Sequence, residues 1–490
     1  MFFRFLTGKI HPSYALMAGV VGVVAGMALV ILLRWRLAVD IWWLVAGVVL
    51  VVAGIMMPRP LLLALPLVGG MMIAGWRAGF DLAGLDYWQG LAGKTVEVTG
   101  EIAEDPDITE TKTALRLKNV RVKDGEMVPG VLYIQLAKND VPERSDVVTL
   151  RGKLGEGFGT FAATMYRPSV VRLERPEPGD IFLHVRNNFA AGVRDYVPAP
   201  AVDLGLGYLL GVRSALPENL LEVLKVVGLT HIIVASGANL AILVNFARGV
   251  FGRLSRWCGF LISLALVVGF VGMVGFTPSM TRAAVVTGLS LLAGYVGRKF
   301  IPLRLLLIVA AGTLLYNPMY LLDLGWLLSF AAFGGIMVVG PRLTEFLYSP
   351  DNKPRGLMPT LLETVAASLL CVPLLLYTFG QMSLVSLAAN LLILPTIPVV
   401  MGLVFATGVL AWVWGFAAEW CGRVAGWLLD FHLSVMNFFG EQKMFLVQIE
   451  PGQTWVFLLY IPIVVPLVVG WRRRRKRWPP PTPPPGKTGT

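Results

Sequence analysis

The stretch Leu204–Asn245 reads LGLGYLLGVRSALPENLLEVLKVVGLTHIIVASGANLAILVN. It is apolar for most of its length, but its last segment carries four polar side chains, those of His231, Ser236, Asn239 and Asn245. A polar side chain at membrane depth is costly, so it usually faces the interior of a helix bundle or a wet cavity. Four such residues in one segment are more than a lipid-facing helix would tolerate. The stretch therefore predicts membrane helices with a polar interior.

The composition of the whole chain agrees with this interpretation. The chain has 490 residues, of which 56% are hydrophobic and 15% are charged, and its mean hydropathy is +0.69. Soluble domains average about 25% charged residues. Apolar runs of about 17 to 25 residues recur and give roughly ten to twelve candidate spans, which are too long for the strands of an outer-membrane barrel. We predict a polytopic α-helical protein of the inner or plasma membrane, with the lipid bilayer as its surroundings.

Changes in composition divide the chain into five predicted parts. Residues 1–80 hold the first transmembrane helices, and their first apolar run is longer than a signal-peptide core. A β domain follows at 90–178, an amphipathic interfacial helix at 181–200 and a polytopic helical domain at 201–470. Residues 471–490 form a basic, proline-rich tail. Its run Arg472–Arg477 marks a cytoplasmic helix end and attracts anionic headgroups, with a separate nucleic-acid role as the other interpretation.

Residues 90–178 show the alternation that is typical of short strands. Thr95–Gly100 and Val131–Leu136 alternate apolar and polar side chains, and Asp124-Gly125 is a hairpin signal between two such runs. Five or so short strands in about 85 residues predict a small barrel of the OB type. OB folds often bind single-stranded nucleic acid through basic grooves and aromatic stacking.

The same β segment offers candidate nucleic-acid contacts. Four basic residues recur along one predicted strand, namely Arg116, Lys118, Arg121 and Lys123. They could form a basic face that contacts DNA. An ordinary solvated strand face remains open as the alternative, because aromatic residues are few here and acidic residues balance the basic ones.

The sequence does not favour an enzyme. His231 and Ser236 lie about 140° apart on a helix and no G-x-S-x-G elbow surrounds the serine, which argues against a hydrolase. The four histidines form no metal motif, and the three cysteines are far apart. Lys94 and Lys487 stand in partial phosphate-loop motifs that lack the required first glycine. We therefore predict no enzymatic activity, no metal and no cofactor, and an energy source outside this chain.

Several blocks in the helical domain resemble a known family. They are Leu210–Pro217, Gly228–His231 with Ser236-Gly237, Phe276–Ala283, Asn317-Pro318 with Leu321–Phe330, Gly380–Leu384 and Asn390–Pro395. In this order they resemble the ComEC-type competence proteins, the inner-membrane channel through which transforming DNA enters bacteria. One departure is Ala238-Asn239, where the family more often has Leu-His.

The resemblance carries several expectations. Members of the family have an OB-like domain outside the membrane, and many end in a metallo-β-lactamase-like domain proposed to degrade the strand that is not imported. This chain stops within twenty residues of its last span, so the resemblance implies a short member without that domain. The implied partners are single-stranded DNA, a separate nuclease, a DNA receptor and a cytoplasmic motor.

A path for a polyanion needs cationic or dipolar groups, but few enough that the strand does not stick. Arg282 lies one turn inside a span, where a guanidinium needs a carboxylate, a phosphate or water, and Asp323 is a candidate partner for Arg282 or Arg213. The expected path residues are Arg213, His231, Ser236, Asn239, Arg282, Asp323, Gln381 and Asn390. Structural ion pairs, a hydrogen-bonded core histidine and helix caps are the alternatives for these residues.

The resulting prediction is an inner-membrane channel that imports single-stranded DNA during natural transformation. A transporter of small solutes or lipid-linked substrates on a similar helical bundle is the alternative, and it would show an occluded midplane site. A third possibility is a membrane scaffold that recruits partners through the proline-rich tail.

Overall fold

The computed structural model describes residues 10–33, 40–108, 112–123, 125–137, 142–177, 179–212, 216–233, 237–251, 255–297, 301–348, 354–356, 358–383, 386–441, 446–462 and 465. The chain divides into two compact units. The first consists of Met1–Leu327 and Leu392–Glu441, and the second of Leu328–Leu391 and Gln442–Thr490. The predicted tail at 471–490 lies outside the described residues.

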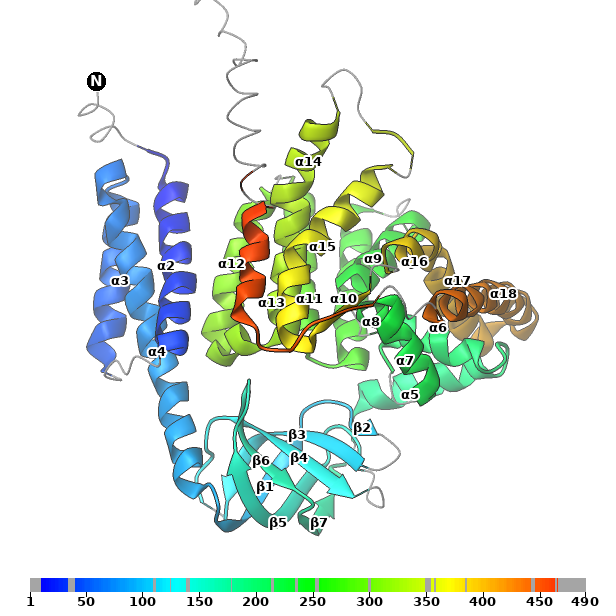
Figure 1. Cartoon of the computed structure of the whole chain (residues 1–490), viewed down its shortest axis with the longest axis horizontal. Coiled ribbons are helices and arrows are strands. Elements are labelled where there is room, and N and C mark those ends of the chain that lie inside the picture. The colour runs from blue at the N-terminus through cyan, green and yellow to red at the C-terminus, as the bar shows by residue number, and fades with distance from the viewer. Residues whose placement is uncertain are drawn as a thin grey trace, which may run out of the picture. The chain divides into compact units, whose positions relative to one another are not determined.

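The first unit opens with three apolar helices that pack closely. They are α2 (Pro12–Leu33), α3 (Ile41–Met56) and α4 (Ala64–Leu91), with the short 3-10 turn η1 (Pro60–Leu63) before α4. Gly22 permits the close approach of α2 to α4, because a Cβ atom there would lie 2.0 Å from the carbonyl oxygen of Leu67. Small residues let membrane helices approach in this way. In Figure 1, α4 continues past α2 and α3 into the β domain.

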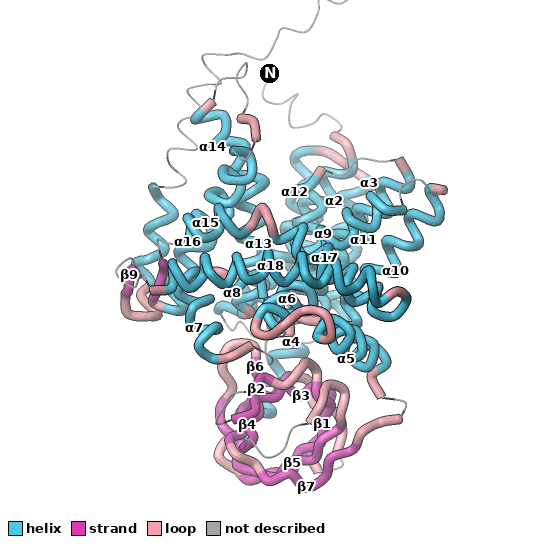
Figure 2. The backbone as a smooth tube through the Cα atoms, turned by 90° about the vertical axis from the view of Figure 1, so that its right-hand side faces the viewer, coloured by secondary structure: helices cyan, strands magenta, loops and turns pink. Residues whose placement is uncertain are grey.

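Seven strands follow, and five of them close into a small barrel. The strands are β1 (Thr95–Ile102), β2 (Asp107–Ile108), β3 (Lys112–Val122), β4 (Val131–Ala137), β5 (Val147–Glu156), β6 (Phe161–Tyr166) and β7 (Ser169–Glu174). Their order is β1-β3-β4-β6-β5, and β5 pairs back with β1. The β4–β6 pair is parallel and the other pairs are antiparallel. Figure 2 shows the backbone of these strands arranged in a ring. The prediction of a small β barrel is confirmed.

The barrel core follows from the alternation in the strands. Every second side chain points inward, which buries Val98, Ile102, Leu115, Leu117, Leu132, Ile134 and Leu150. Trp88 near the end of α4 joins this core, and its indole Nε1 donates a hydrogen bond to the carbonyl oxygen of Pro129 at 2.9 Å. The last turn of α4 is therefore anchored in the barrel core through Trp88.

The rest of the first unit is helical. Its elements are α5 (Ile181–Arg194), α6 (Ala201–Leu210), α7 (Glu218–Val227), α8 (Thr230–Ile233), α9 (Gly237–Phe251), α10 (Arg256–Val274), α11 (Pro278–Val296), α12 (Pro302–Tyr316), η2 (Pro318–Leu322), the start of α13 (Leu324–Gly334), α17 (Ile397–Val413) and α18 (Gly415–Gly440). The hydroxyl of Thr277 caps the first turn of α11 by accepting a hydrogen bond from the Met280 amide at 3.3 Å. On α18 one face is buried, whereas Trp420 and Trp427 on the other face are exposed.

The second unit is smaller and is built around α15 (Met358–Phe379). It also holds the end of α13, the π-helical turn η3 (Gly335–Val339), α14 (Gly340–Leu347), most of α16 (Ser386–Ile393), the two-stranded antiparallel sheet of β8 (Gln381–Ser383) and β9 (Leu446–Gln448), and η5 (Thr454–Leu459). The turn η3 packs tightly on α15, because a Cβ atom at Gly335 would lie 2.4 Å from the carbonyl oxygen of Ala366.

The described residues include six helices that are long and apolar enough to span a membrane, where the sequence predicted roughly ten to twelve spans. They are Pro12–Leu33, Pro60–Leu91, Trp257–Val274, Pro278–Val296, Leu324–Leu347 and Met358–Phe379. Four shorter apolar helices accompany them, namely Ile41–Met56, Ala201–Leu210, Pro302–Tyr316 and Ile397–Val413. Hydropathy predicts one span at 232–250 and another at 384–400. The second is divided, because α16 ends at Ile393 and α17 begins at Ile397, whereas residues 234–236 of the first lie outside the described residues.

Candidate functional site

Asn239 is a predicted path residue that lies in the interior of the first unit. It stands in the first turn of α9 and is only 1% exposed. Its side-chain Nδ2 donates a hydrogen bond to the carbonyl oxygen of Tyr208 at 2.7 Å and a longer one to that of Ile232 at 3.4 Å. The carbonyl groups in the last turn of a helix lack partners within that helix, and Tyr208 is in the last turn of α6. The amide therefore joins α6, α8 and α9.

Arg282 lies close to the same place. It stands in the second turn of α11 and is 2% exposed. A Cβ atom built on Gly237, the first residue of α9, would lie 3.4 Å from the guanidinium Nη2. The absence of a side chain at Gly237 thus makes room for the guanidinium beside the start of α9. The structure brings Arg282 and Asn239 to one junction between α9 and α11.

Asp323 has a different environment from the one that the sequence suggested. Its Oδ1 accepts a hydrogen bond of 2.7 Å from the backbone amide of Trp326, so it caps the start of α13. The guanidinium of Arg116, on the β barrel, also acts electrostatically on this carboxylate. Among the described residues, Asp323 forms no ion pair with Arg282, because its carboxylate lies at the helix cap instead.

The other predicted path residues are described only in part. Asn390 lies in α16 and is buried, and its Oδ1 has no hydrogen-bond partner among the described residues. Gln381 pairs with Gln448 through the backbone of β8 and β9, and His231 belongs to α8, but neither side chain is among those described. Arg213 and Ser236 lie outside the described residues.

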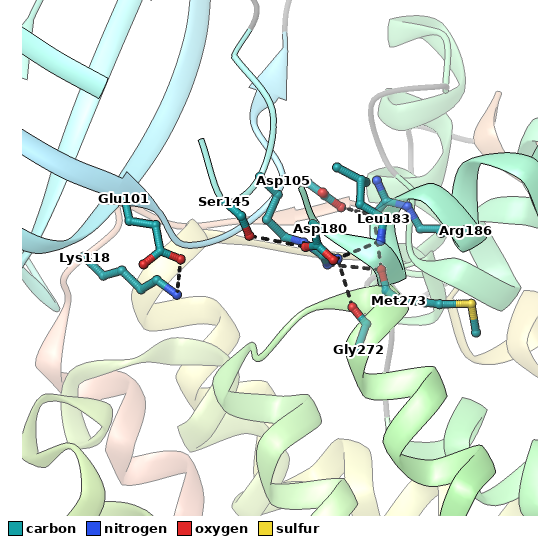
Figure 3. A network of polar contacts seen from close by, with 10 residues as sticks. Glu101, Asp105, Lys118, Ser145, Asp180, Leu183, Arg186, Gly272 and Met273 are labelled. Atoms are coloured by element: carbon teal, nitrogen blue, oxygen red, sulfur yellow. Dashed lines mark hydrogen bonds and ion pairs between the residues drawn. The ribbon is translucent and has the colours of Figure 1, made fainter. Parts of the chain in front are cut away.

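The predicted basic residues of the barrel point outward, but two of them are ion-paired. Lys118 Nζ lies 2.8 Å from Glu101 Oε1, as Figure 3 shows, and Arg116 pairs with Glu104. Arg121 is exposed, opposite Thr99 of β1. Lys123 follows the end of β3 with a backbone φ of 45°. The four residues therefore form a face of mixed charge rather than a purely basic one.

An aromatic cluster lies beside Arg116 on the outside of the barrel. The ring centroids of Tyr133, Phe158 and Phe161 are 5.2 to 5.5 Å apart, and the guanidinium of Arg116 lies over the Phe161 ring at 5.8 Å. Phe158 is 51% exposed, and Tyr166 at the end of β6 is exposed as well. We call Arg116, Tyr133, Phe158 and Phe161 the aromatic patch.

From the sequence, aromatic residues were expected to be few in this segment, and their clustering was not predicted. Arg116 and Tyr133 are opposite one another in the β3–β4 ladder, and Val131 is opposite Phe161 in the parallel β4–β6 ladder. The outward position of Tyr133 could have been read from the alternation in Val131–Leu136. The pairing of β4 with β6 could not, because it joins strands that are separated by β5.

The aromatic patch has the chemistry of a surface that binds unstacked bases. Exposed rings stack with bases, and an arginine beside them can contact the backbone phosphate or a base. A tyrosine hydroxyl is protonated at neutral pH, and burial raises the pKa of Tyr133 further above its usual value of 10. Within the described residues, no group of three or more His, Cys, Asp and Glu side chains is placed to hold a metal ion.

Comparisons with known proteins place the helical domain in a family. A family model described as Competence protein matches residues 208–474. The ComE operon protein 3 of Bacillus subtilis (strain 168) is 24% identical over 215 residues, which cover 44% of this chain and 27% of that protein. The uncharacterized protein YcaI of Escherichia coli (strain K12) is 24% identical over 274 residues, which cover 51% of this chain and 35% of that protein.

The chain thus aligns with only about a third or less of the length of these relatives, and no solved structure matches it. The family match begins at Tyr208 in α6 and includes α9 and α11, which carry Asn239 and Arg282. Because that match spans more than half of the chain, this membrane protein belongs to the competence protein family.

Proposed function

We propose that this protein is the inner-membrane channel that imports single-stranded DNA during natural transformation. In this proposal the β barrel is an OB-like domain outside the cytoplasm that receives the strand, and the helical domain provides the path. The single observation that carries the proposal is the aromatic patch, in which three clustered rings and Arg116 form an outward-facing surface on the barrel.

The strand order of the barrel supports this role for the patch. If the two-residue β2 is set aside, five strands close in the order first, second, third, fifth, fourth. OB folds are five-stranded Greek-key barrels that bind oligonucleotides on the face of their second and third strands. Arg116 lies on the second of these strands and Tyr133 on the third. The patch thus occupies the face on which an OB fold would hold a strand.

The ion pairs of the barrel face fit the binding of a polyanion. The Arg116 side chain is 48% exposed in its pair with the partly buried Glu104, and ion pairs that reach the solvent contribute little stability, so a phosphate can replace the carboxylate as the partner of the guanidinium at small cost. Arg116 would exchange Glu104 for a backbone phosphate and keep its place over Phe161. Stacking contributes roughly 1–3 kcal/mol per base and does not depend on sequence, as uptake of arbitrary DNA requires.

The buried polar groups of the helical domain support a path through it. Arg282 and Asn239 lie together between helices that are otherwise apolar, and Arg282 is the cation we propose for the strand at membrane depth. A single buried guanidinium would attract phosphates without trapping the strand. We further propose that a DNA receptor, a separate nuclease and a cytoplasmic motor act with this protein, as the family resemblance implies.

The test is an import assay in cells that lack this protein. Labelled DNA is supplied, and strand in the cytoplasm is measured after complementation with the wild type, with Tyr133→Ala/Phe161→Ala or with Arg282→Ala. We expect import to require the protein and to fall at least tenfold in both variants at equal amounts in the membrane. Arg423→Ala is the matched control, because Arg423 is exposed and pairs only locally with Glu419. Unchanged import in the deletion strain would refute the proposal, and transport of small solutes without DNA would favour the alternative transporter.

A further inference from the structure

Two buried arginines connect the barrel region to the end of α10. Arg144 lies just before β5 and Arg186 lies in α5, and they are 6% and 7% exposed. Figure 3 shows the groups around them, which include Asp105, Asp180 and the last residues of α10. Arginine is rarely buried unless it is paired, because hydrogen bonds and ion pairs must offset the cost of removing the guanidinium charge from water.

Arg144 divides its hydrogen bonds between a carboxylate and the main chain of α10. Its Nε donates to Asp180 Oδ2 at 2.7 Å, its Nη2 to the carbonyl oxygen of Gly272 at 2.9 Å and its Nη1 to that of Met273 at 3.1 Å. Asp180 is also the cap of α5, since its Oδ1 accepts a hydrogen bond of 3.1 Å from the Leu183 amide. One side chain therefore joins the barrel, the start of α5 and the end of α10.

Arg186 completes the same arrangement from α5. Its Nη1 pairs with the carboxylate of Asp105, in the loop between β1 and β2, and donates to the carbonyl oxygen of Met273 at 3.3 Å. The helices α5 and α10 also touch directly, because a Cβ atom at Gly272 would lie 2.6 Å from the ring of Phe182. Gly272 thus leaves the space that brings both arginines within reach of the main chain.

The partners on α10 explain why arginine is used here. Gly272 and Met273 lie in the last turn of α10, where carbonyl groups have no partner within the helix and carry the negative end of the helix dipole. A guanidinium has five N–H donors, so it can bind two carbonyl oxygens and a carboxylate at once. Such a contact fixes orientation as well as distance, which a hydrophobic contact alone would not do.

A second contact of the same kind involves the helix that leads into the barrel. The helix α4, which enters the barrel core through Trp88, carries Arg77. Arg77 donates hydrogen bonds of 2.8 Å to the carbonyl oxygens of Leu315 and Tyr316 at the end of α12 and pairs with Asp81 at 3.0 Å. Arginines thus bind the carbonyl ends of two helices, with Arg144 and Arg186 at α10 and Arg77 of α4 at α12.

We infer that Arg144 and Arg186 are positioning residues that hold the barrel in one fixed orientation at the end of α10. The residue after α10, Gly275, has a φ of 101°, and the turn that it begins leads directly into α11, which carries Arg282. If the proposed function holds, the aromatic patch stays at one fixed position relative to α10 and α11. The DNA strand then enters the path from a rigidly held barrel and not from a domain that moves. The fixed orientation itself does not depend on that function.

Distance measurements between two spin labels test the inference on the full-length protein in lipid nanodiscs. One label is placed on the native Cys258, which is exposed on α10, and the other on the exposed β5 position of a Lys153→Cys variant. Cys371 and Cys421 are replaced by serine. We expect a narrow distance distribution in the parent protein and a distribution at least twofold broader in Arg144→Gln/Arg186→Gln. The matched control is Arg172→Gln, because Arg172 is an exposed barrel arginine paired with Glu174, and it should not change the width.

A distribution that stays equally narrow in the double variant would overturn the inference. If the double variant does not insert into membranes, Asp105→Asn replaces it, because it removes the carboxylate of Arg186 and leaves the Arg144 contacts in place. A smaller broadening is expected there, and an unchanged width would overturn the inference as well. Affinity for single-stranded DNA is measured on the same samples. It should stay constant, because the aromatic patch is intact, so a failure of DNA binding in the parent protein would count against the proposed function only.

Discussion

Arginines have different roles in two regions of the molecule, the outer face of the barrel and the junction of the barrel with α10. Arg116 is half-exposed, pairs with one carboxylate and lies over an aromatic ring. Arg144 and Arg186 are buried and bind main-chain carbonyl groups together with carboxylates. The first arrangement leaves a cation that can change partner, whereas the second fixes the parts that it joins. Burial and the type of acceptor, not charge, therefore separate a binding residue from a positioning residue.

Replacing Arg144 by alanine should have the largest effect on stability. The change leaves the Asp180 carboxylate and two carbonyl groups buried without their partner, and breaking a buried ion pair in this way costs roughly 3–5 kcal/mol. Thermal unfolding and limited proteolysis of the full-length protein should show the loss. Lys118→Ala is the control, because its exposed pair with Glu101 is worth about 1 kcal/mol or less. Equal losses in the two variants would contradict the distinction drawn between buried and exposed pairs.

Replacing Tyr133 by alanine should weaken DNA binding strongly. It should change the stability of the junction with α10 only slightly. Loss of one stacking ring weakens single-stranded DNA binding by about 1–3 kcal/mol, which is roughly a 5- to 150-fold rise in Kd. Fluorescence anisotropy at constant salt measures the change. Leu173→Ala is the control, since Leu173 is an exposed apolar residue of β7 away from the aromatic patch. An equal loss of affinity in both variants would show that the barrel binds DNA without a specific surface.

The sequence predicted the barrel well because period-two alternation is a local property. It placed Arg116 and Lys118 on the outer face, alternating with the buried Leu115 and Leu117. Strict alternation would turn Arg121 inward, yet Arg121 is exposed. The reason is a bulge at Asn119, whose φ is 53°, and an extra residue in one strand shifts the phase of the side chains that follow. The outward position of Arg121 thus depends on a bulge that the alternation alone did not reveal.

The helical domain was harder to predict, for a physical reason. Hydropathy detects apolar length but not the breaks at which a helix ends, so the predicted span at 384–400 is divided between α16 and α17. Of the polar residues in apolar segments that were expected to lie inside, Asn239 and Arg282 are buried, whereas Asn245 is exposed. The partners of Arg144 could not be predicted, because they are backbone carbonyl groups that every residue possesses.

Removing the charge of Arg116 should have a modest effect on DNA binding that depends on salt. Arg116→Gln loses one phosphate contact and a cation–π contact with Phe161 that is worth about 0.5–1 kcal/mol. For single strands, each neutralised phosphate contributes about 0.7 to the slope of log affinity against log salt, so the slope should fall by about that amount. Titrations at several salt concentrations measure it. Arg151→Gln, an exposed arginine of β5, is the control, and a slope that falls equally in both would mean that no barrel arginine is a specific contact.

The smallest effect concerns pH, and it has opposite signs for the two kinds of arginine partner. Burial raises the pKa of Glu104 above its usual 4.5 by more than Arg116 lowers it. The folded barrel therefore takes up a proton before the unfolded chain does, and stability should rise as the pH falls through the window just above 4.5. For Asp180, burial also acts to raise the pKa, but the hydrogen bonds from Arg144 and from the Leu183 amide outweigh it, and the pKa lies below 3.8. Here the unfolded chain binds the proton first, so stability should fall as the pH drops through 3.8 and below.

Hydrogen exchange of the barrel amides between about pH 3 and 6, corrected for the intrinsic exchange rate, should show both trends. Glu104→Gln should remove only the first and Asp180→Asn only the second. If one variant removed both trends, the two carboxylates would titrate as a single coupled group, and the Arg116–Glu104 pair and the junction with α10 could no longer be treated as independent.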